Sequence, residues 1–557
     1  MRGVEACVRA LWVAAWSAAL ILMVAFAGAL AASPGKPPEM DQYGGYREIR
    51  SPGGGTGFFR VEKIGARWIF VTPEGHAFWL RAVYGVDTYD GGAAYRDVLM
   101  RKYSPKNDPN WKPDWFPWGA FVGQTSKRLK AWGFNCIGEN SAIYAMHGVR
   151  SDTNPEPIPF IRMIRPAYYA IQPKPGVKNL VAGTDPSVFH HWRGWTLPDL
   201  FDPAFATFVQ GMANGEWGTY PSSLEKNPWL LGTTTDDADQ LPGIKGGPHL
   251  GWFVAITAPT QDGKPVYSKL AFRDFLKRKY QTLEALNGAW KARYTTWESD
   301  GAPWPQGKGV LDESGKNRWF PKDLWQAADA GPVVKADLDA FAEFVADKYY
   351  STTVSALKAY TPKHLVFGPA AILSQHASEA TLRAAARHVD VLQVNALPNN
   401  LDVILKVYEI THKPIFVWTT LIAQKDSPLA GSPAGDWNGA QLFATQAERG
   451  MAYADYIRAL SNLRAADGTY PVVGIDWWAW TDKAAGGEST NFGLVTNQDN
   501  AYDGKEAVQG TGADRWGYPT GREKRDYGDF ISAVVKANAE LDMKLQSELG
   551  SGSRAAR

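Results

Sequence analysis

Cysteine is almost absent from this sequence, which holds only Cys7 and Cys136 in 557 residues. Cys7 lies in an N-terminal segment with the features of an export signal, so Cys136 is the only cysteine expected in the processed chain. One cysteine cannot form an intrachain disulfide. The fold must therefore be stabilised by a large hydrophobic core.

The sequence also lacks an excess of charge of either sign. It has 59 Lys and Arg against 57 Asp and Glu, a formal net charge of +2. Chains that bind nucleic acids or anionic membranes through electrostatics usually carry an excess of basic residues. We therefore expect no nucleic-acid partner, and membrane association only through an uncleaved N-terminal segment.

Several motifs are missing as well. No glycine-rich loop follows a strand and opens a helix, and no serine lies in a Gly-x-Ser-x-Gly turn. His190 and His191 are adjacent, but neighbouring residues point apart on a strand and no matched third ligand is evident. Nucleotide chemistry and α/β-hydrolase chemistry are therefore unsupported, and we expect neither a metal nor a cofactor.

Residues 1–32 are expected to form a signal peptide. Two arginines precede an apolar run from Ala10 to Leu30, and Ala29-Leu30-Ala31 supplies the small residues of a cleavage site. The run is long enough that an uncleaved anchor is the alternative. Residues 33–56, rich in Pro and Gly, are expected to be a linker. The protein is then secreted or periplasmic.

The rest of the chain alternates short apolar runs with helical patterns. Residues 57–75 predict a small N-terminal β hairpin with a Pro-Glu-Gly turn. Eight strand-like runs follow, and most are separated by helices; they start near residues 76, 134, 159, 229, 364, 389, 413 and 471. This count and rhythm predict a (β/α)₈ TIM barrel over residues 76–549.

The fourth run ends in a cluster of acids, Asp236, Asp237 and Asp239. Catalytic groups of such barrels lie at the carboxyl ends of the strands, so the cluster is a candidate active site. Helix capping by Asp is one alternative. Binding of Ca²⁺ is another, although the spacing is too short for an EF-hand loop.

Several segments resemble the barrel glycoside hydrolases that include the β-agarases and the β-galactosidase-like enzymes. Together the similar segments span most of residues 57–545. They are GFFRVEKIGARWIFVTPEGHAFWLRAVYGVD, WGFNCIGENS, LPDLFDPAF, RDFLKRKYQTLEALNGAW and NFGLVTNQDNAYDGKEAV. The resemblance implies retaining hydrolysis by two glutamates about 5 Å apart, one at the end of strand four and one at the end of strand seven.

This sequence departs from that pattern at both positions. Strand four ends in Thr235-Asp236-Asp237-Ala238-Asp239, without an Asn-Glu pair, and strand seven ends in Trp418-Thr419-Thr420, without a carboxylate. By alignment Asp237 is nearest to the family's acid, so it is our first choice as general acid, followed by Asp236 and Asp239. Asp476, after strand eight, is a candidate base or nucleophile, with Glu488 and Glu139 as further candidates.

Aromatic residues are abundant, with 24 Trp, 24 Phe and 23 Tyr. Most belong to the core on general grounds, but those at strand ends are candidate platforms for sugar rings. The expected substrate-binding residues are Trp418, Trp477, Trp478, Trp480, Asn140 and Asn395. We expect a glycoside hydrolase-like protein acting on extracellular polysaccharide or oligosaccharide. The alternative is a non-catalytic carbohydrate-binding barrel.

Overall fold

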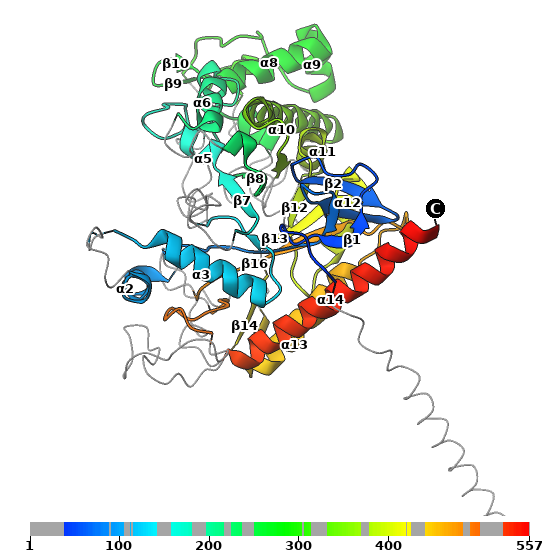
Figure 1. The fold of residues 1–557 in the computed structure, drawn as a ribbon. Helices are drawn as coiled ribbons and strands as arrows, with labels where there is room; N and C mark the ends of the chain where they lie inside the picture. The colour runs from blue at the N-terminus through cyan, green and yellow to red at the C-terminus, as the bar shows by residue number, and fades with distance from the viewer. Residues whose placement is uncertain are drawn as a thin grey trace, which may run out of the picture.

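The computed structural model of the chain (Figure 1) is described here for fifteen stretches of sequence. They are residues 38–88, 91–104, 112, 115–141, 157–180, 197–216, 224–236, 250–303, 306–313, 331–368, 378–418, 420–424, 441–482, 491–501 and 527–555. The predicted signal segment lies outside them. In the described residues, no helix combines the length and apolar character needed to cross a membrane.

Eight parallel strands form the barrel at the centre of the molecule. In chain order they are β5 (Leu80–Val83), β6 (Cys136–Ile137), β7 (Phe160–Ile164), β8 (Leu230–Thr235), β11 (Leu365–Phe367), β12 (Leu392–Asn395), β13 (Ile415–Trp418) and β16 (Val472–Trp477). A parallel bridge from Phe367 to Val391 closes the ring. The predicted barrel is confirmed, and each of the eight apolar runs contains one of its strands.

Helices surround this ring and cover its outer face, which is why most barrel strands are apolar on both sides. The helices of the described residues are α2 (Gly92–Tyr103), α3 (Trp118–Ala131), α5 (Pro166–Ala170), α6 (Pro203–Asn214), α7 (Leu250–Ala255), α8 (Tyr267–Tyr280), α9 (Leu283–Trp290), α10 (Pro332–Tyr360), α11 (Glu379–His388), α12 (Asp402–Thr411), α13 (Gln446–Asn462) and α14 (Gly528–Ala555). Two 3₁₀ turns are η2 (Leu224–Lys226) and η3 (Val310–Asp312).

Local sequence sets several helix ends. In α6 the Asp202 side chain accepts a hydrogen bond from the Ala204 amide, Pro203 occupies the first turn, and Gly215 ends the helix at φ 87°. In α13 Thr445 and Glu448 form a reciprocal capping box. These residues fix where the chain turns between barrel strands.

A separate four-stranded antiparallel sheet precedes the barrel. It contains β1 (Tyr46–Arg50), β2 (Arg60–Ile64), β3 (Arg67–Val71) and β4 (His76–Phe78). The predicted hairpin is its β2–β3 pair, but β1 lies inside the segment expected to be a linker because it pairs with β4. The Phe70 ring lies 6.0 Å from that of Phe367, so this sheet packs against the barrel strands.

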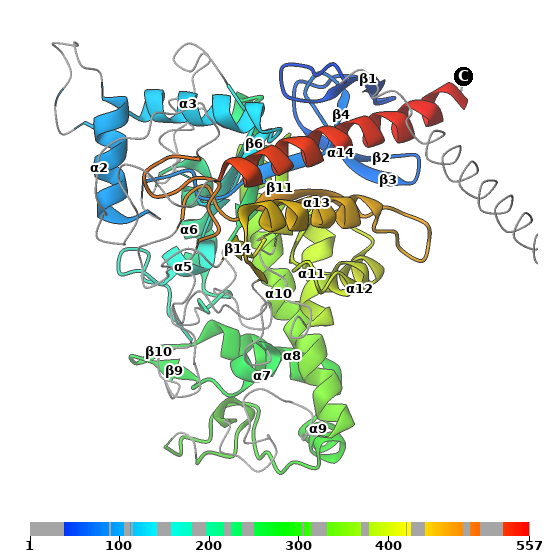
Figure 2. The ribbon, with the colours of Figure 1, turned by 90° about the horizontal axis from the view of Figure 1, so that it is seen from below.

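Between β8 and β11 the chain forms an insertion that extends away from the barrel (Figures 1 and 2). It includes α7, α8, α9 and a small hairpin of β9 (Thr260–Gln261) and β10 (Lys264–Pro265). The first half of α10 packs against it and the second half returns toward the barrel. A second small pair, β14 (Ile422–Gln424) and β15 (Gln441–Phe443), follows β13.

The last helix, α14, runs alongside α13 and past the N-terminal sheet (Figure 2). A buried ion pair fixes it to the first barrel strand, since Arg81 Nη1 lies 2.6 Å from Asp542 Oδ1. The Tyr46 hydroxyl donates to the same carboxylate oxygen at 2.7 Å. The C-terminal helix, β1 and β5 are therefore joined at one carboxylate.

Candidate active site

The carboxyl ends of the barrel strands, which we call the barrel mouth, gather residues from opposite ends of the sequence. Glu139 follows β6, the second barrel strand, and Asp476 lies near the end of β16, the eighth. The Glu139 amide donates a hydrogen bond of 3.1 Å to Asp476 Oδ2 across 337 residues of sequence. Both side chains are fully buried. Two buried acidic residues are thus joined at the end of the barrel where α/β barrels place their active sites.

The strand between these two acids leaves room for the contact. Asp476 is in register with Ala82 of β5, and Ala82 is in register with Cys136 of β6. Small side chains at these positions allow the Asp476 carboxyl group to lie over the β6 backbone. Gly138 is essential to this arrangement, because a Cβ at that position would overlap the Asp476 carboxylate.

Two neutral donors converge on Glu139. The Thr234 hydroxyl of β8 and the Gln393 Nε2 of β12 both donate to Glu139 Oε1. Hydrogen bonds donated to a carboxylate favour its ionised form. Four barrel strands therefore contribute to one buried network, and its centre is the Glu139 carboxylate.

The environment of Asp476 has the opposite effect. Burial, and after it the nearby charge of Glu139, raises the pKa of Asp476 well above its ordinary value. The hydrogen bond from the Glu139 amide lowers that pKa, but by less. The geometry therefore favours a neutral Asp476 beside an ionised Glu139. Two neighbouring acids in such different surroundings are suited to different roles in proton transfer.

A row of polar side chains extends from Asp476 along the barrel mouth. Asn395, Trp418 and Asp476 are in register on β12, β13 and β16. Asn395 Oδ1, Trp418 Nε1 and Asp476 Oδ1 are each buried without a hydrogen-bond partner in the described part of the chain. Such atoms cost about 1–3 kcal/mol each when unsatisfied, so a row of them indicates a place for a polar ligand.

The predicted aspartate cluster is only partly described. Asp237 and Asp239 lie outside the described residues, so their roles stay predictions. Asp236 is buried and accepts hydrogen bonds from the Ala167 amide, at 3.1 Å, and from the Tyr349 hydroxyl. It holds α5 and α10 at the end of β8, a position that favours the capping alternative for this residue. A calcium site at the cluster also stays untested.

The four candidate tryptophans fall into two groups. Trp477 and Trp480 are fully buried, and their indole N–H groups donate to Phe492 O and the Tyr95 hydroxyl. Their surroundings favour the core-packing alternative. Trp418 and Trp478 instead share a small cluster at the barrel mouth with Tyr84, Leu421, Ala423, Ala479 and Phe492. These two indoles lie beside the acid pair.

The two candidate asparagines also differ. Asn395 belongs to the polar row described above. Asn140 directly follows Glu139, has φ 50°, and accepts a hydrogen bond of 3.1 Å from Arg165 Nη2. It therefore joins the end of β6 to the end of β7. Its expected role in substrate binding stays a prediction.

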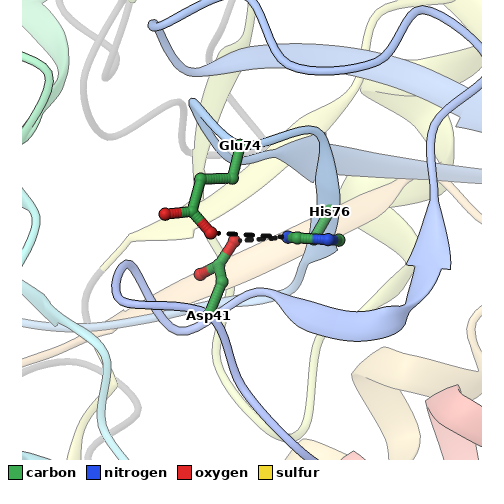
Figure 3. A group of neighbouring side chains, drawn as sticks. All are labelled: Asp41, Glu74 and His76. Carbon is green, nitrogen blue, oxygen red and sulfur yellow. Dashed lines mark hydrogen bonds and ion pairs between the residues drawn. The ribbon is translucent and has the colours of Figure 1, made fainter.

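One cluster of possible metal ligands lies in the described residues, at Asp41, Glu74 and His76 of the N-terminal sheet (Figure 3). His76 Nδ1 is 2.8 Å from Asp41 Oδ2 and 4.0 Å from Glu74 Oε2. Asp41 already accepts hydrogen bonds from the Thr72 hydroxyl and the amides of Tyr43 and Gly45. These bonds explain the cluster as a brace between the chain before β1 and the turn before β4.

Sequence reasoning assigned no role to Thr234 or Gln393, which hold Glu139. Both stand in ordinary strand positions, and a threonine or glutamine in a strand carries no catalytic signal by itself. The one available signal is their place near the carboxyl ends of apolar runs in a predicted barrel. Glu139 also lies near the carboxyl end of an apolar run. Its contact with Asp476 could not be predicted, because it forms only when the barrel closes and brings the two strand ends together.

The curated proteins that this chain matches include two β-agarases. It is 24% identical over 488 residues to β-agarase B of Vibrio sp. (strain JT0107), which covers 80% of this chain and 47% of that protein. β-Agarase A of the same strain is 24% identical over 403 residues, or 68% of this chain and 34% of that protein. The resemblance inferred from the sequence is confirmed.

Solved structures give the same result for the fold. An agarase crystal structure has a TM-score of 0.61 at 19% identity, over 92% of this chain and 69% of the other. An exo-β-agarase has the same TM-score and identity, over 95% and 70%. No protein-family model matches the chain. The chain spans about half the length of β-agarase B and about a third of that of β-agarase A.

Proposed function

We propose that this protein is a glycoside hydrolase that cleaves O-glycosidic bonds of an agar-type galactan, as polysaccharide or oligosaccharide, by carboxylate acid/base chemistry. The observation that carries the proposal is the meeting of Glu139 and Asp476 at the mouth of an agarase-like barrel. Hydrolysis of a glycosidic bond requires two carboxyl groups in different protonation states. The surroundings of this pair favour such a difference.

Exposed aromatic rings beside the mouth support a carbohydrate substrate. Tyr168 and Tyr169 lie on α5, directly after the third barrel strand, and are 38% and 39% exposed. Their ring centroids are 5.1 Å apart. A tyrosine presents an apolar face together with a polar hydroxyl, which suits a sugar ring with one apolar side. This pair would take a unit of the chain outside the reaction centre.

The activity is tested with purified protein, agarose and agaro-oligosaccharides. We expect new reducing ends to accumulate, and sized oligosaccharides to be shortened in chromatography. A panel of other galactans and plant glucans serves as the control for specificity. A protein that binds agaro-oligosaccharides and releases no product from any glycan would contradict the proposal.

The second candidate function is carbohydrate binding without hydrolysis. It is favoured by one observation: β8 and β13, the fourth and seventh barrel strands, end without the glutamates that the agarase resemblance implies. Under this function the protein releases no product, and Asp237→Ala, at the position nearest to the family's acid, leaves the affinity for the carbohydrate unchanged. Under hydrolysis with Asp237 as general acid, the same variant lowers kcat by about 10²–10⁴-fold.

We further propose that the protein is exported and that residues 1–32 are removed. The apolar run with small residues at its end supports this. N-terminal sequencing of protein recovered from the periplasm or medium should give a start near Ser33. Recovery of the full-length chain in the membrane fraction would favour the anchor instead.

A further inference from the structure

We propose that Glu139 and Asp476 are the catalytic pair of this barrel, Asp476 as proton donor and Glu139 as nucleophile. The inference rests on the proposed hydrolase function and names the groups that perform it. It moves the reaction from strands four and seven to strands two and eight. Glu139 accepts hydrogen bonds from residues of β8 and β12, and Asp476 accepts one from the Glu139 amide.

The hydrogen bonds decide which oxygen of Asp476 carries a proton. Its Oδ2 accepts the Glu139 amide hydrogen at 3.1 Å, so Oδ2 acts as an acceptor. The proton of the neutral acid then resides on Oδ1. This atom is buried and has no hydrogen-bond partner in the stretches that the structure describes. An O–H group without an acceptor among the described residues can donate to a ligand oxygen that reaches it.

Glu139 is fixed in the complementary state. Thr234 and Gln393 donate to its Oε1 from β8 and β12, the two strands on either side of β11. These two donors favour the carboxylate and hold it in one orientation, as a nucleophile requires.

The neighbours of the pair suit the hydroxyl groups of one sugar ring. Gln393 Oε1 and Asn395 Oδ1 are acceptors, Trp418 Nε1 is a donor, and each is buried without a hydrogen-bond partner among the described residues. Because Asn395 and Trp418 are in register with Asp476, a ring held by them lies beside the proton donor. These three side chains are uncharged, which favours a neutral ligand over an anionic one.

The reaction balances with water as the only second substrate. Asp476 transfers its proton to the glycosidic oxygen while the bond from that oxygen to the anomeric carbon breaks. A Glu139 oxygen forms a bond to the same carbon. Water then attacks this carbon, gives a proton back to Asp476, and displaces Glu139 as a carboxylate. Both groups return to their starting states.

Two variants and two substrates test this assignment. Asp476→Ala should lower kcat on agaro-oligosaccharides at least 100-fold, but much less on an aryl glycoside whose leaving group needs no proton. Glu139→Ala should be inactive on both substrates, and azide should restore turnover of the aryl glycoside and yield a glycosyl azide. A residue with only a structural role would give neither the leaving-group dependence nor the azide product.

Asp199→Asn is the matched control. Asp199 is also a buried aspartate with a raised pKa, caused mainly by burial, but it caps α8 through Ser268 and Tyr267 in the insertion. It should leave kcat within about twofold of the wild type, as expected for a change that removes no transition-state contact. Folding of every variant is checked by circular dichroism, and binding of an agaro-oligosaccharide by calorimetry.

The outcomes separate the two proposals. One outcome is a wild type that hydrolyses agaro-oligosaccharides while the folded Asp476→Ala and Glu139→Ala variants keep more than a tenth of its kcat. That result would overturn the catalytic role of the pair and leave the proposed hydrolase function standing. If the alanine variants do not fold, Asp476→Asn and Glu139→Gln replace them under the same criterion. A wild type that cleaves no glycan overturns the function, and the catalytic role of the pair with it.

Discussion

The Asp476 side chain gives a pH prediction at the scale of one residue. Burial and the nearby Glu139 raise its pKa in the folded protein above that of the unfolded chain. The folded state therefore holds the proton more tightly, and this contribution to stability is present below the unfolded pKa and lost as pH rises through the folded one. The melting temperature of Asp476→Asn relative to the wild type should thus increase as pH rises from acidic values. A difference that is constant with pH would contradict a neutral Asp476.

Asp236 gives a second prediction at this scale, because its contacts and its sequence position suggest different roles. Asp236→Ala leaves the Ala167 amide and the Tyr349 hydroxyl without their acceptor. We expect a loss of about 1–3 kcal/mol for each group in denaturant unfolding. Tyr349→Phe, which removes only the donor, should cost less. If Asp236 is instead an acid of the reaction, Asp236→Ala loses activity at unchanged stability.

At the scale of elements, the turn after β6 depends on a residue without a side chain. Gly138→Ala places a methyl group where the Asp476 carboxylate lies. We expect the Asp476 carboxyl group to be displaced and the activity to fall at least tenfold. Gly119→Ala in α3, where a Cβ meets open space, is the control. Equal activity of the two variants would show that the position of Asp476 is unimportant.

The docking of α14 depends on one buried ion pair. Asp542→Ala leaves Arg81 buried without its partner carboxylate, and also removes the acceptor of Tyr46. Removal of one member of such a pair costs about 3–5 kcal/mol. Asp542→Asn keeps an acceptor for both groups and should cost less. Chemical denaturation measures both, and a loss below about 1 kcal/mol for Asp542→Ala would indicate that α14 is held by apolar packing alone.

For the whole molecule, the barrel could be predicted because each strand is an apolar run. Apolar runs that alternate with helices are compatible with few folds. Glu139 and Asp476 were visible only as acids at strand ends. Their contact spans 337 residues and depends on ring closure, which no local pattern encodes. The tryptophans after β16 were ambiguous for a related reason. Neighbours on a strand face opposite sides, so Trp477 enters the helical layer while Asp476 faces the barrel interior.

The proposed chemistry needs no metal, and this is also a prediction for the whole protein. Hydrolysis of agaro-oligosaccharides should be unchanged after dialysis against EDTA, because two carboxyl groups supply both proton transfer and nucleophilic attack. Calcium at the Asp236, Asp237 and Asp239 cluster is the alternative. In that case EDTA lowers activity and added Ca²⁺ restores it.

The most direct test of the barrel mouth as the functional site is a crystal structure of the Asp476→Asn variant with an agaro-oligosaccharide bound. The account predicts a sugar ring at the barrel mouth, with the glycosidic oxygen within hydrogen-bond distance of the residue-476 side chain and ring hydroxyls on Asn395 and Trp418. An oligosaccharide seated elsewhere on the protein, with the barrel mouth closed to it, would contradict the account.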